Sequence, residues 1–347
     1  MFLSSPERQD LAACRELLRN GSRTFHMASM VLPWRIRAPA SAIYAFCRVA
    51  DDAIDLCEGG RRRVQALERL EMRLDRIYAG MPLNTPIDRA VARTVQVFEM
   101  PRALPAALIE GLRWDAEERR YDDLSGVHDY AARVAGSVGA MMAVLMGVRD
   151  PSALARAADL GLGMQLSNIA RDVGEDARAG RIYLPLSWLR EAGIDPEAFL
   201  ANPRFTPELG EVVQRLLEVA EGHYARGAAG IRRLPADCRY AIRLAGLLYA
   251  EIGHVVARRG GDSVASRAVV PGRRKLALAM KALGGAPATF AKAPALPETR
   301  YLVEAAAIEP ESGFDPAEGR IAWVVDLFTR LELRETGQNL GRIDLAR

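Results

Sequence analysis

The sequence contains no long uninterrupted apolar run. No window reaches the roughly 18 apolar residues that a membrane-spanning helix needs, so we predict no transmembrane helix. The segment Met1–Pro6 has no basic region followed by an apolar stretch, and we therefore expect no signal peptide. These two absences predict a protein of the cytoplasm.

Cysteine is scarce, with four residues in 347, and no pair has the C-x-x-C spacing. We therefore expect free thiols in a reducing compartment and neither a disulfide framework nor a zinc site. No G-x-G-x-x-G follows a strand pattern, so no Rossmann-type cofactor site is predicted. The net charge of +3 is too small to argue for nucleic acid, although it fits an anionic substrate.

Strand-like alternation and internal repeats are also absent, whereas helical spacing of apolar residues recurs along the chain. Half of the residues are hydrophobic, which is enough for a sizeable core. We predict an all-α fold, a single large bundle around a central cavity. The predicted helices span residues 6–20, 41–56, 61–78, 85–98, 105–118, 127–146, 151–176, 206–234, 236–259, 273–283 and 321–331.

The most informative stretch runs from Gln165 to Asp176. At helical spacing, Gln165, Asn168, Asp172 and Asp176 share one face, at i, i+3, i+7 and i+11. Carboxylates one turn apart repel each other, so a helix that keeps them beside an apolar wall usually offers them a cation. Hard oxygen ligands of this kind suit Mg²⁺ or Mn²⁺.

A second acidic face precedes it in the chain. Asp51 and Asp55 are spaced i and i+4, with Arg48 one turn and Tyr44 two turns back on the same face. Each face alone is also compatible with a solvated helix surface. Two such faces meeting across a bundle favour a diphosphate substrate held through metal ions, with arginines neutralising the remaining charge.

These residues resemble the two signatures of the squalene/phytoene synthase family. The matching patterns are Cys47-Arg48-x-x-Asp51-Asp52-x-x-Asp55, Asn168-x-x-Arg171-Asp172-x-x-Glu175-Asp176 and Gly180-Arg181-x-Tyr183-Leu184-Pro185. The resemblance extends from about Arg15 to about Lys275. Within this family, the sequence looks most similar to the bacterial phytoene synthases. It implies the isoprenoid-synthase fold and a head-to-head condensation of two prenyl diphosphates.

The resemblance also implies a role for individual residues. Those expected to hold Mg²⁺ on the two diphosphates are Asp51, Asp55, Asn168, Asp172 and Asp176. Those expected to contact diphosphate oxygens or the reacting centre are Arg48, Arg171, Arg267, Tyr44 and Tyr183, with Asp51 and Asp172 counted among the catalytic residues. Those expected to bind the rest of the substrate are Ser22, Arg23 and Phe25 in a flap, Val134, Gly139, Leu162, Gln165 and Leu166 in a tunnel, and Tyr249.

The sequence leaves three interpretations open. Tyr249 fits core packing as well as a family pattern, and the glycines of the run 134–139 fit either close helix packing or room for a ligand. For the basic cluster 273–275, a solvated helix start is favoured over a diphosphate or membrane-surface patch.

The chain divides into a predicted catalytic domain, residues 1–283, and a C-terminal extension, residues 284–347. The extension begins with a linker rich in Gly, Ala and Pro, continues through one helix and ends in a polar tail. It carries no pattern that the resemblance explains.

The activity implied is the synthesis of 15-cis-phytoene from two geranylgeranyl diphosphates through a cyclopropyl (prephytoene) diphosphate, the first step of carotenoid biosynthesis. The expected cofactor is Mg²⁺ or Mn²⁺, without NADPH. A squalene or dehydrosqualene synthase using farnesyl diphosphate is the alternative within this chemistry. A non-catalytic assembly factor is the alternative from another class.

The expected product is a hydrocarbon without polar groups, which can leave only into lipid. We therefore expect peripheral contact with the inner membrane, and downstream carotenoid enzymes as further partners. No contact with nucleic acid is expected.

Overall fold

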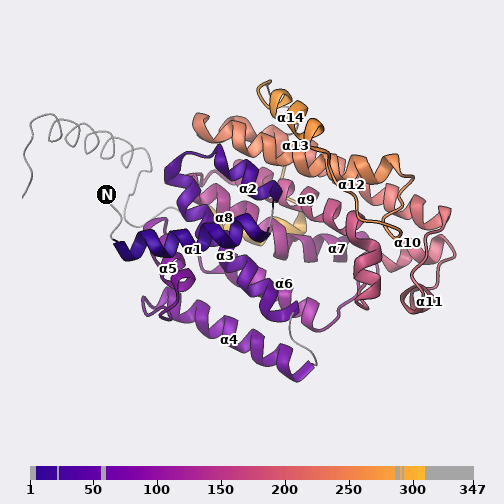
Figure 1. The fold of residues 1–347 in the computed structure, drawn as a ribbon, viewed down its shortest axis with the longest axis horizontal. Helices are drawn as coiled ribbons and strands as arrows, with labels where there is room; N and C mark the ends of the chain where they lie inside the picture. The colour runs from indigo at the N-terminus through magenta and orange to yellow at the C-terminus, as the bar shows by residue number, and fades with distance from the viewer. Residues whose placement is uncertain (1–4, 22, 56–59, 286–289, 291–292, 309–347) are drawn as a thin grey trace, which may run out of the picture.

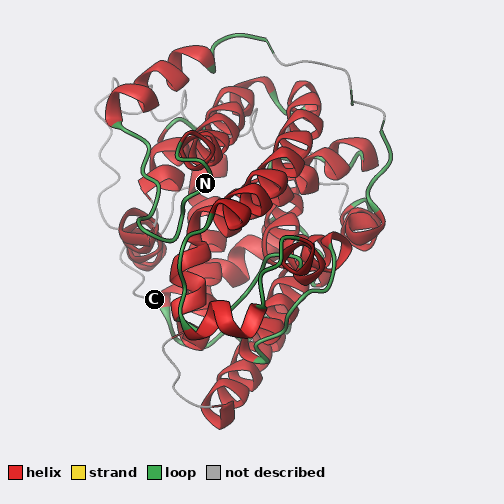
Figure 2. Ribbon diagram, turned by 90° about the vertical axis from the view of Figure 1, so that its right-hand side faces the viewer, coloured by secondary structure: helices red, strands yellow, loops and turns green. Residues whose placement is uncertain are grey.

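The computed structural model describes residues 5–21, 23–55, 60–285, 290 and 293–308. Within these residues every regular element is helical, and the helices form one elongated bundle (Figures 1 and 2). None of the helices in this part of the chain is both long and apolar enough to cross a membrane.

The α-helices are α1 (Ser5–Gly21), α2 (Arg23–Met30), α3 (Trp34–Asp55), α4 (Gly60–Tyr78), α5 (Pro86–Val97), α6 (Ala103–Ala116), α7 (Leu124–Ala131), α8 (Ser137–Leu145), α9 (Pro151–Arg178), α10 (Leu186–Glu191), α11 (Pro196–Ala201), α12 (Pro207–Gly230), α13 (Ala236–Arg258), α14 (Gly272–Lys281) and α15 (Arg300–Ala306). Three short pieces, η1 (Ala132–Gly136, a π-helix), η2 (Ile231–Arg233) and η3 (Pro297–Thr299), link some of them.

Helix α9 is the centre of the bundle and packs against α8, α12, α13 and α15. Its start is encoded locally, because Asp150 accepts a hydrogen bond from the backbone N–H of Ala153 and Pro151 occupies the first turn. Close approach to η1 requires glycine at position 161, where a Cβ atom would lie 2.3 Å from the carbonyl oxygen of Ala135.

The segment predicted as one helix over 127–146 consists of α7, η1 and α8. The π-helical turn lies at the small-residue run, and π-helical turns are frequent at functional sites. Gly139 has the packing role considered above, because a Cβ atom there would lie 2.2 Å from the carbonyl oxygen of Ala157. Most other helix boundaries agree with the predictions within a few residues, whereas α3 begins seven residues earlier than expected, at Trp34.

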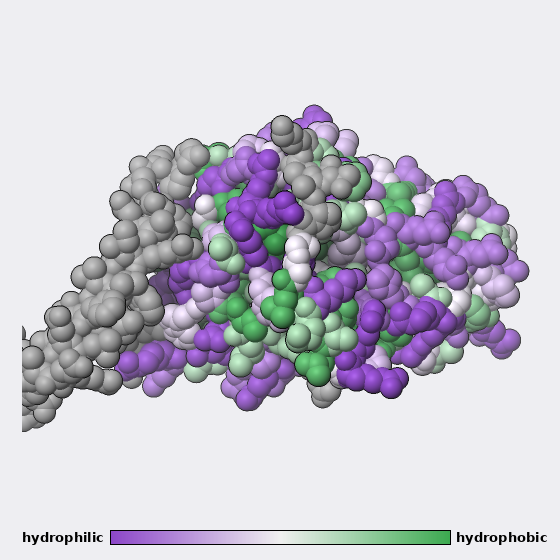
Figure 3. Space-filling view, turned by 90° about the horizontal axis from the view of Figure 1, so that it is seen from above, coloured by the Kyte–Doolittle hydropathy of each residue, from purple (hydrophilic) through white to green (hydrophobic). Residues whose placement is uncertain are grey.

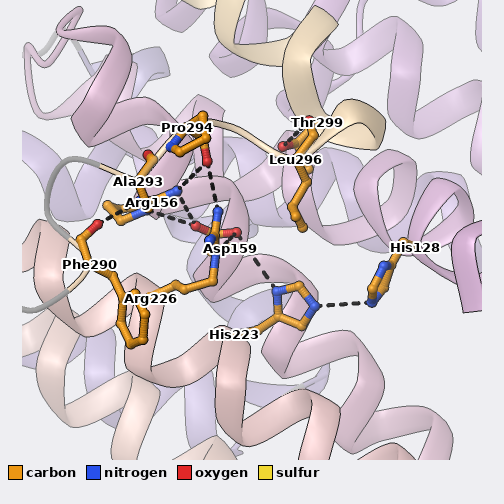
Figure 4. Close-up of polar contacts among 10 residues, drawn as sticks. All are labelled: His128, Arg156, Asp159, His223, Arg226, Phe290, Ala293, Pro294, Leu296 and Thr299. Carbon is orange, nitrogen blue, oxygen red and sulfur yellow. Dashed lines mark hydrogen bonds and ion pairs between the residues drawn. The ribbon is translucent and has the colours of Figure 1, made fainter.

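Part of the segment predicted as a linker is firmly attached to the bundle. Arg156 donates hydrogen bonds to the carbonyl oxygens of Phe290, Ala293 and Pro294, and Arg226 also donates to Pro294 (Figure 4). Beyond it, α15 packs against α6, α8 and α9. The predicted helix over 321–331 and the polar tail lie outside the described residues, and the division at residue 283 stays a prediction.

The two arginines that hold this segment belong to a buried polar cluster on α9 and α12. The Asp159 carboxylate is fully buried and pairs with Arg156 at 2.7 Å and with Arg226 at 3.1 Å (Figure 4). His223 lies 3.8 Å from the same carboxylate, and its Nε2 atom is 3.0 Å from that of His128. Removing one member of such a cluster would leave a buried charge without its partner, so the cluster fixes the geometry of the segment.

We predict that Leu302→Ala destabilises the protein. The Leu302 side chain is fully buried in the main apolar core, and truncating a buried leucine typically costs about 2–5 kcal/mol. Urea and thermal unfolding measure the loss. Ile308→Ala, at a side chain that is 66% exposed, is the control and should change stability by less than about 0.5 kcal/mol. Equal effects of the two changes would contradict this packing.

Candidate active site

The two acidic helix faces predicted from the sequence meet in the structure. Asp51 from α3 lines the same polar pocket, about 120 Å³ in volume, as Asn168, Asp172 and Asp176 from α9. The other polar side chains around this pocket are Asp115, Tyr130, Gln165, Arg181 and Tyr183. Four carboxylates from three helices therefore surround one small volume.

A larger apolar cavity of about 260 Å³ adjoins the polar pocket. Gln165 and Asn168 line both, so they mark the junction between them. Along α9 the wall of the cavity continues from Asn168 back to Ala153, a distance of about 22 Å at 1.5 Å per residue. The result is a long apolar tunnel with an acidic end.

Helical periodicity decides which residues of α9 face this tunnel. Leu160, Gly161 and Met164 line it, together with the residues at its two ends. Leu162 and Leu166, predicted as tunnel residues, do not line it, and both side chains are fully buried in the apolar core. The correction follows from the 100° step of the helix, which turns positions 162 and 166 away from the stripe that carries Leu160 and Met164.

Arginines neutralise the carboxylate of Asp172. Arg171 pairs with it through two hydrogen bonds of 2.8 and 2.5 Å, and Arg267 approaches its other side at 2.9 Å. On α3, Arg48 lies 2.6 Å from Asp52 and 3.7 Å from Asp51. The arginines predicted to contact diphosphate are therefore placed at the acidic pocket, where an incoming anion could exchange for the carboxylates as their partner.

Asp176 has no such compensation. Its carboxylate makes no ion pair or hydrogen bond with a described residue, and burial together with the charge of Asp172 raises its pKa to about 7, against an opposing effect of Arg181. The Oδ1 atom of Asn168 is also buried without a hydrogen-bond partner. Both are oxygen atoms that can accept hydrogen bonds or bind a cation, and the described residues give neither of them a partner.

These oxygen atoms fit a hard divalent cation, which binds carboxylate and amide oxygens. Among the described residues, no three or more His, Cys, Asp or Glu side chains already form a group able to hold a metal ion. The carboxylate of Asp172 points to its arginines instead. A cation would therefore need the remaining ligands from its own water and from a substrate phosphate, as magnesium usually does.

Asp115 is a residue of the polar pocket that was not predicted from the sequence, and α6 places it in the pocket wall. Its carboxylate accepts hydrogen bonds from Tyr183 at 2.7 Å and from Tyr130 at 3.0 Å, and the two tyrosine rings stack at 5.0 Å. Burial raises the pKa of Asp115 to about 7, although the two tyrosine hydroxyls act in the opposite direction. An acidic residue on the apolar face of the 105–118 helix was the signal that could have revealed it.

The structure also places most of the other predicted residues. Tyr44, Val134, Gly139 and Tyr249 line the tunnel, and Tyr183 lines the polar pocket. Tyr249 and Gly139 thus combine packing with a place in the cavity wall.

Four predictions concern residues that the structure does not fully describe. Ser22 lies outside the described residues, and so do the side chains of Arg23, Phe25 and Asp55, whose backbone belongs to α2 and α3. Their predicted roles stay predictions.

The helical bundle with an apolar tunnel that ends in carboxylates is the architecture of the isoprenoid-synthase fold. A solved structure of a dehydrosqualene synthase in complex with ligand is similar to this chain, with a TM-score of 0.72 and 29% identity, over 80% of this chain and 96% of that one. The all-α isoprenoid-synthase fold predicted from the sequence is thereby confirmed.

Comparison of sequences narrows the class to one family. The family model described as squalene/phytoene synthase matches residues 18–275. The phytoene synthase of Rhodobacter capsulatus is 54% identical over 305 residues, which cover 86% of this chain and 90% of that protein. The phytoene synthase of Cereibacter sphaeroides is 50% identical over 350 residues, which cover 96% and 97%. The chain belongs to the squalene/phytoene synthase family, as its two motifs predicted.

We predict that Asp176→Asn stabilises the metal-free protein at pH 8. A folded-state pKa of about 7 lies above the roughly 3.9 of an unfolded aspartate, so this group loses folding stability as the pH rises from about 4 to about 7. The amide should recover about 1–4 kcal/mol at pH 8 and less at pH 5. Urea unfolding with a chelator present measures both values.

Asp172→Asn is the matched control, because it removes the carboxylate that pairs with Arg171 and Arg267. This variant should not become more stable at pH 8. A destabilised Asp176→Asn protein at that pH would show that the carboxylate has a compensating partner.

Proposed function

We propose that the protein is a phytoene synthase that joins two geranylgeranyl diphosphates head to head. Two relatives in which half or more of the aligned residues are identical carry the name phytoene synthase, and this supports the enzymatic assignment. The structural observation behind the proposal is the junction at Gln165 and Asn168, where an acidic pocket opens into an apolar tunnel. A molecule with a diphosphate head and a long hydrocarbon chain matches both parts.

The diphosphate groups would bind through Mg²⁺ held by Asp51, Asp55, Asn168, Asp172 and Asp176. The orphaned oxygen of Asn168 and the uncompensated carboxylate of Asp176 support this ligand set. When bound, the metal would supply Lewis-acid stabilisation of the leaving diphosphate.

The arginines would take part of the same charge. Arg171 and Arg267 now share the carboxylate of Asp172, and Arg48 lies beside Asp51 and Asp52. A guanidinium presents a planar set of donors that matches phosphate oxygens. Because these side chains are already held at the pocket, little reorganisation is needed when the diphosphate departs.

The tunnel would protect the carbocation that remains after the diphosphate leaves. Its wall is formed mainly by apolar and small side chains, so bulk water has little access to the reacting carbon atoms. Aromatic rings stabilise cationic carbon, and Tyr44 and Tyr249 lie in the wall near the acidic end. Tyr183 faces the pocket where ionisation would occur.

The family chemistry then proceeds through a cyclopropyl diphosphate, a second ionisation and a rearrangement. A phytoene synthase ends the sequence by losing a proton and requires no reductant, and we propose the same here. The alternative farnesyl diphosphate substrate has no comparable support, since the dehydrosqualene synthase structure shares 29% identity against the 50–54% of the two phytoene synthases.

A hydrocarbon product without polar groups is insoluble in water. We therefore propose peripheral contact with the cytoplasmic membrane face for product release, and downstream carotenoid enzymes as recipients of the product.

We predict that purified protein with Mg²⁺ converts geranylgeranyl diphosphate to phytoene at the same rate with and without NADPH. The length of the tunnel along α9 favours the longer substrate. NADPH should have no effect because the proposed chemistry contains no reductive step. Product analysis by chromatography and mass spectrometry decides the question. A C30 hydrocarbon from farnesyl diphosphate, with none from the longer substrate, would refute the chain-length assignment.

We predict that Asn168→Leu and Asp172→Asn each lower turnover at least about 100-fold. The reason is that losing a residue that only hydrogen-bonds to a metal ligand already lowers metal affinity or activity about 10–100-fold. Calorimetric titration with Mg²⁺ and pyrophosphate should show weaker binding in both variants. Asp122→Asn removes an exposed carboxylate outside the pocket and should keep wild-type values. Unchanged binding in the two pocket variants would exclude them as ligands.

A further inference from the structure

Helix α14 lies on the outside of the bundle, against α13 (Figure 1). Its inner side is apolar, because Leu278 and the following Ala282 are buried against Leu244 and Leu248 of α13. This packing fixes the orientation of the helix and therefore determines which side chains face outward.

The outward side of α14 is apolar as well. Leu276 and Met280 are spaced i and i+4 on one face of α14, and Leu283 follows at i+7 in the turn just after the helix ends at Lys281. The three residues are 69%, 63% and 66% exposed. A soluble helix normally presents polar residues on the face opposite its core contacts. Three large exposed aliphatic side chains on one face indicate a partner surface.

The segment that carries this face has charge of one sign. Between Asp262 and Glu298 the sequence contains no acidic residue, whereas it contains six basic ones. Arg274 is held by Glu251, but Arg273, Lys275 and Lys281 form no ion pair with a described residue. On the side of the molecule that carries α14, apolar side chains lie among strongly hydrophilic ones (Figure 3).

The apolar tunnel lies directly behind the helices that carry α14. One side of α13 packs on α14, and another side contributes Ile242 and Ala245 to the tunnel wall. Helix α2 has the same double role, because Met27 packs against the α14 cluster while Ala28 and Ser29 line the tunnel. Helix α14 therefore lies on the side of the molecule where α2 and α13 form part of the tunnel wall.

We infer that the face formed by Leu276, Met280 and Leu283, with its flanking cations, docks on a bilayer that contains anionic lipid. Exposed aliphatic side chains enter the boundary between headgroups and acyl chains, and lysine and arginine beside them attract anionic headgroups. A second copy of this chain fits less well, because a self-complementary contact would bring these cations together without acidic partners. Docking through α14 would bring the side of the molecule that carries α2 and α13 close to lipid. An exit for the product on this side rests on the proposed function.

The test compares vesicle binding of full-length proteins by flotation. Vesicles of phosphatidylcholine alone and with phosphatidylglycerol serve as probes, at low and high salt. The docking variant is Leu276→Gln/Met280→Gln/Leu283→Gln, since glutamine is a good helix former. The matched control is Val64→Gln/Met72→Gln/Val97→Gln, which replaces three exposed apolar side chains on α4 and α5.

We expect the wild type and the control to bind vesicles with phosphatidylglycerol, and the docking variant to bind at least tenfold more weakly. High salt or removal of the anionic lipid should also weaken binding, because the cations contribute. Lys275→Gln/Lys281→Gln should reduce the salt dependence. Equal binding of docking variant and control, or no binding of the wild type, would overturn the inference. The inference would also be overturned if the docking variant changed its sedimentation mass but bound vesicles as the wild type does. That result would show that this face forms a contact between two copies of the chain.

Turnover in detergent micelles separates this inference from the proposed function. The docking variant should retain wild-type turnover there, because none of its three residues lines the tunnel or the polar pocket. Absence of phytoene formation by the wild type in micelles would refute the proposed function and leave the vesicle result unaffected.

Discussion

Mutual repulsion of closely spaced carboxylates, most of them partly buried, is the constraint on which the rest of this structure depends. Asp51, Asp115, Asp172 and Asp176 surround one small pocket, and only part of their charge is balanced. Arginines balance Asp172, two tyrosine hydroxyls solvate Asp115, and Asp176 is left with a pKa near 7. A helix bundle keeps such an arrangement only when packing elsewhere compensates its cost. In the function we propose, a bound cation would relieve this repulsion.

The compensation comes from the length of α9. This helix carries Asp172 and Asp176 near its C-terminal end, and its other sides are buried against neighbouring helices, chiefly α8, α12 and α13. Close contacts at Gly139 and Gly161 hold those neighbours near enough to leave a narrow tunnel. The same helix presents Arg156, which is paired with Asp159, to the segment before α15. One element therefore positions both the acidic pocket and the attachment of this segment.

Separation of polar and apolar volumes gives the site its chemical meaning. The acidic pocket is lined mainly by polar side chains, and the adjoining tunnel is lined mainly by apolar ones. A charged leaving group and the hydrocarbon cation it leaves behind therefore remain in different environments. At the surface, α14 packs on α13, which forms part of the tunnel wall, and exposes a further group of apolar side chains.

Most of the helices, the family and the paired acidic faces follow from the amino-acid sequence, because helical periodicity and the spacing of Asp172 and Asp176 are local properties. Which apolar residues face the tunnel depends on the neighbours of each helix, and packing turns Leu162 and Leu166 away from it. The tertiary structure also revealed Asp115, whose partners Tyr130 and Tyr183 are distant in sequence. The attachment of the chain before α15 likewise depends on long-range hydrogen bonds to Arg156, which composition alone cannot indicate.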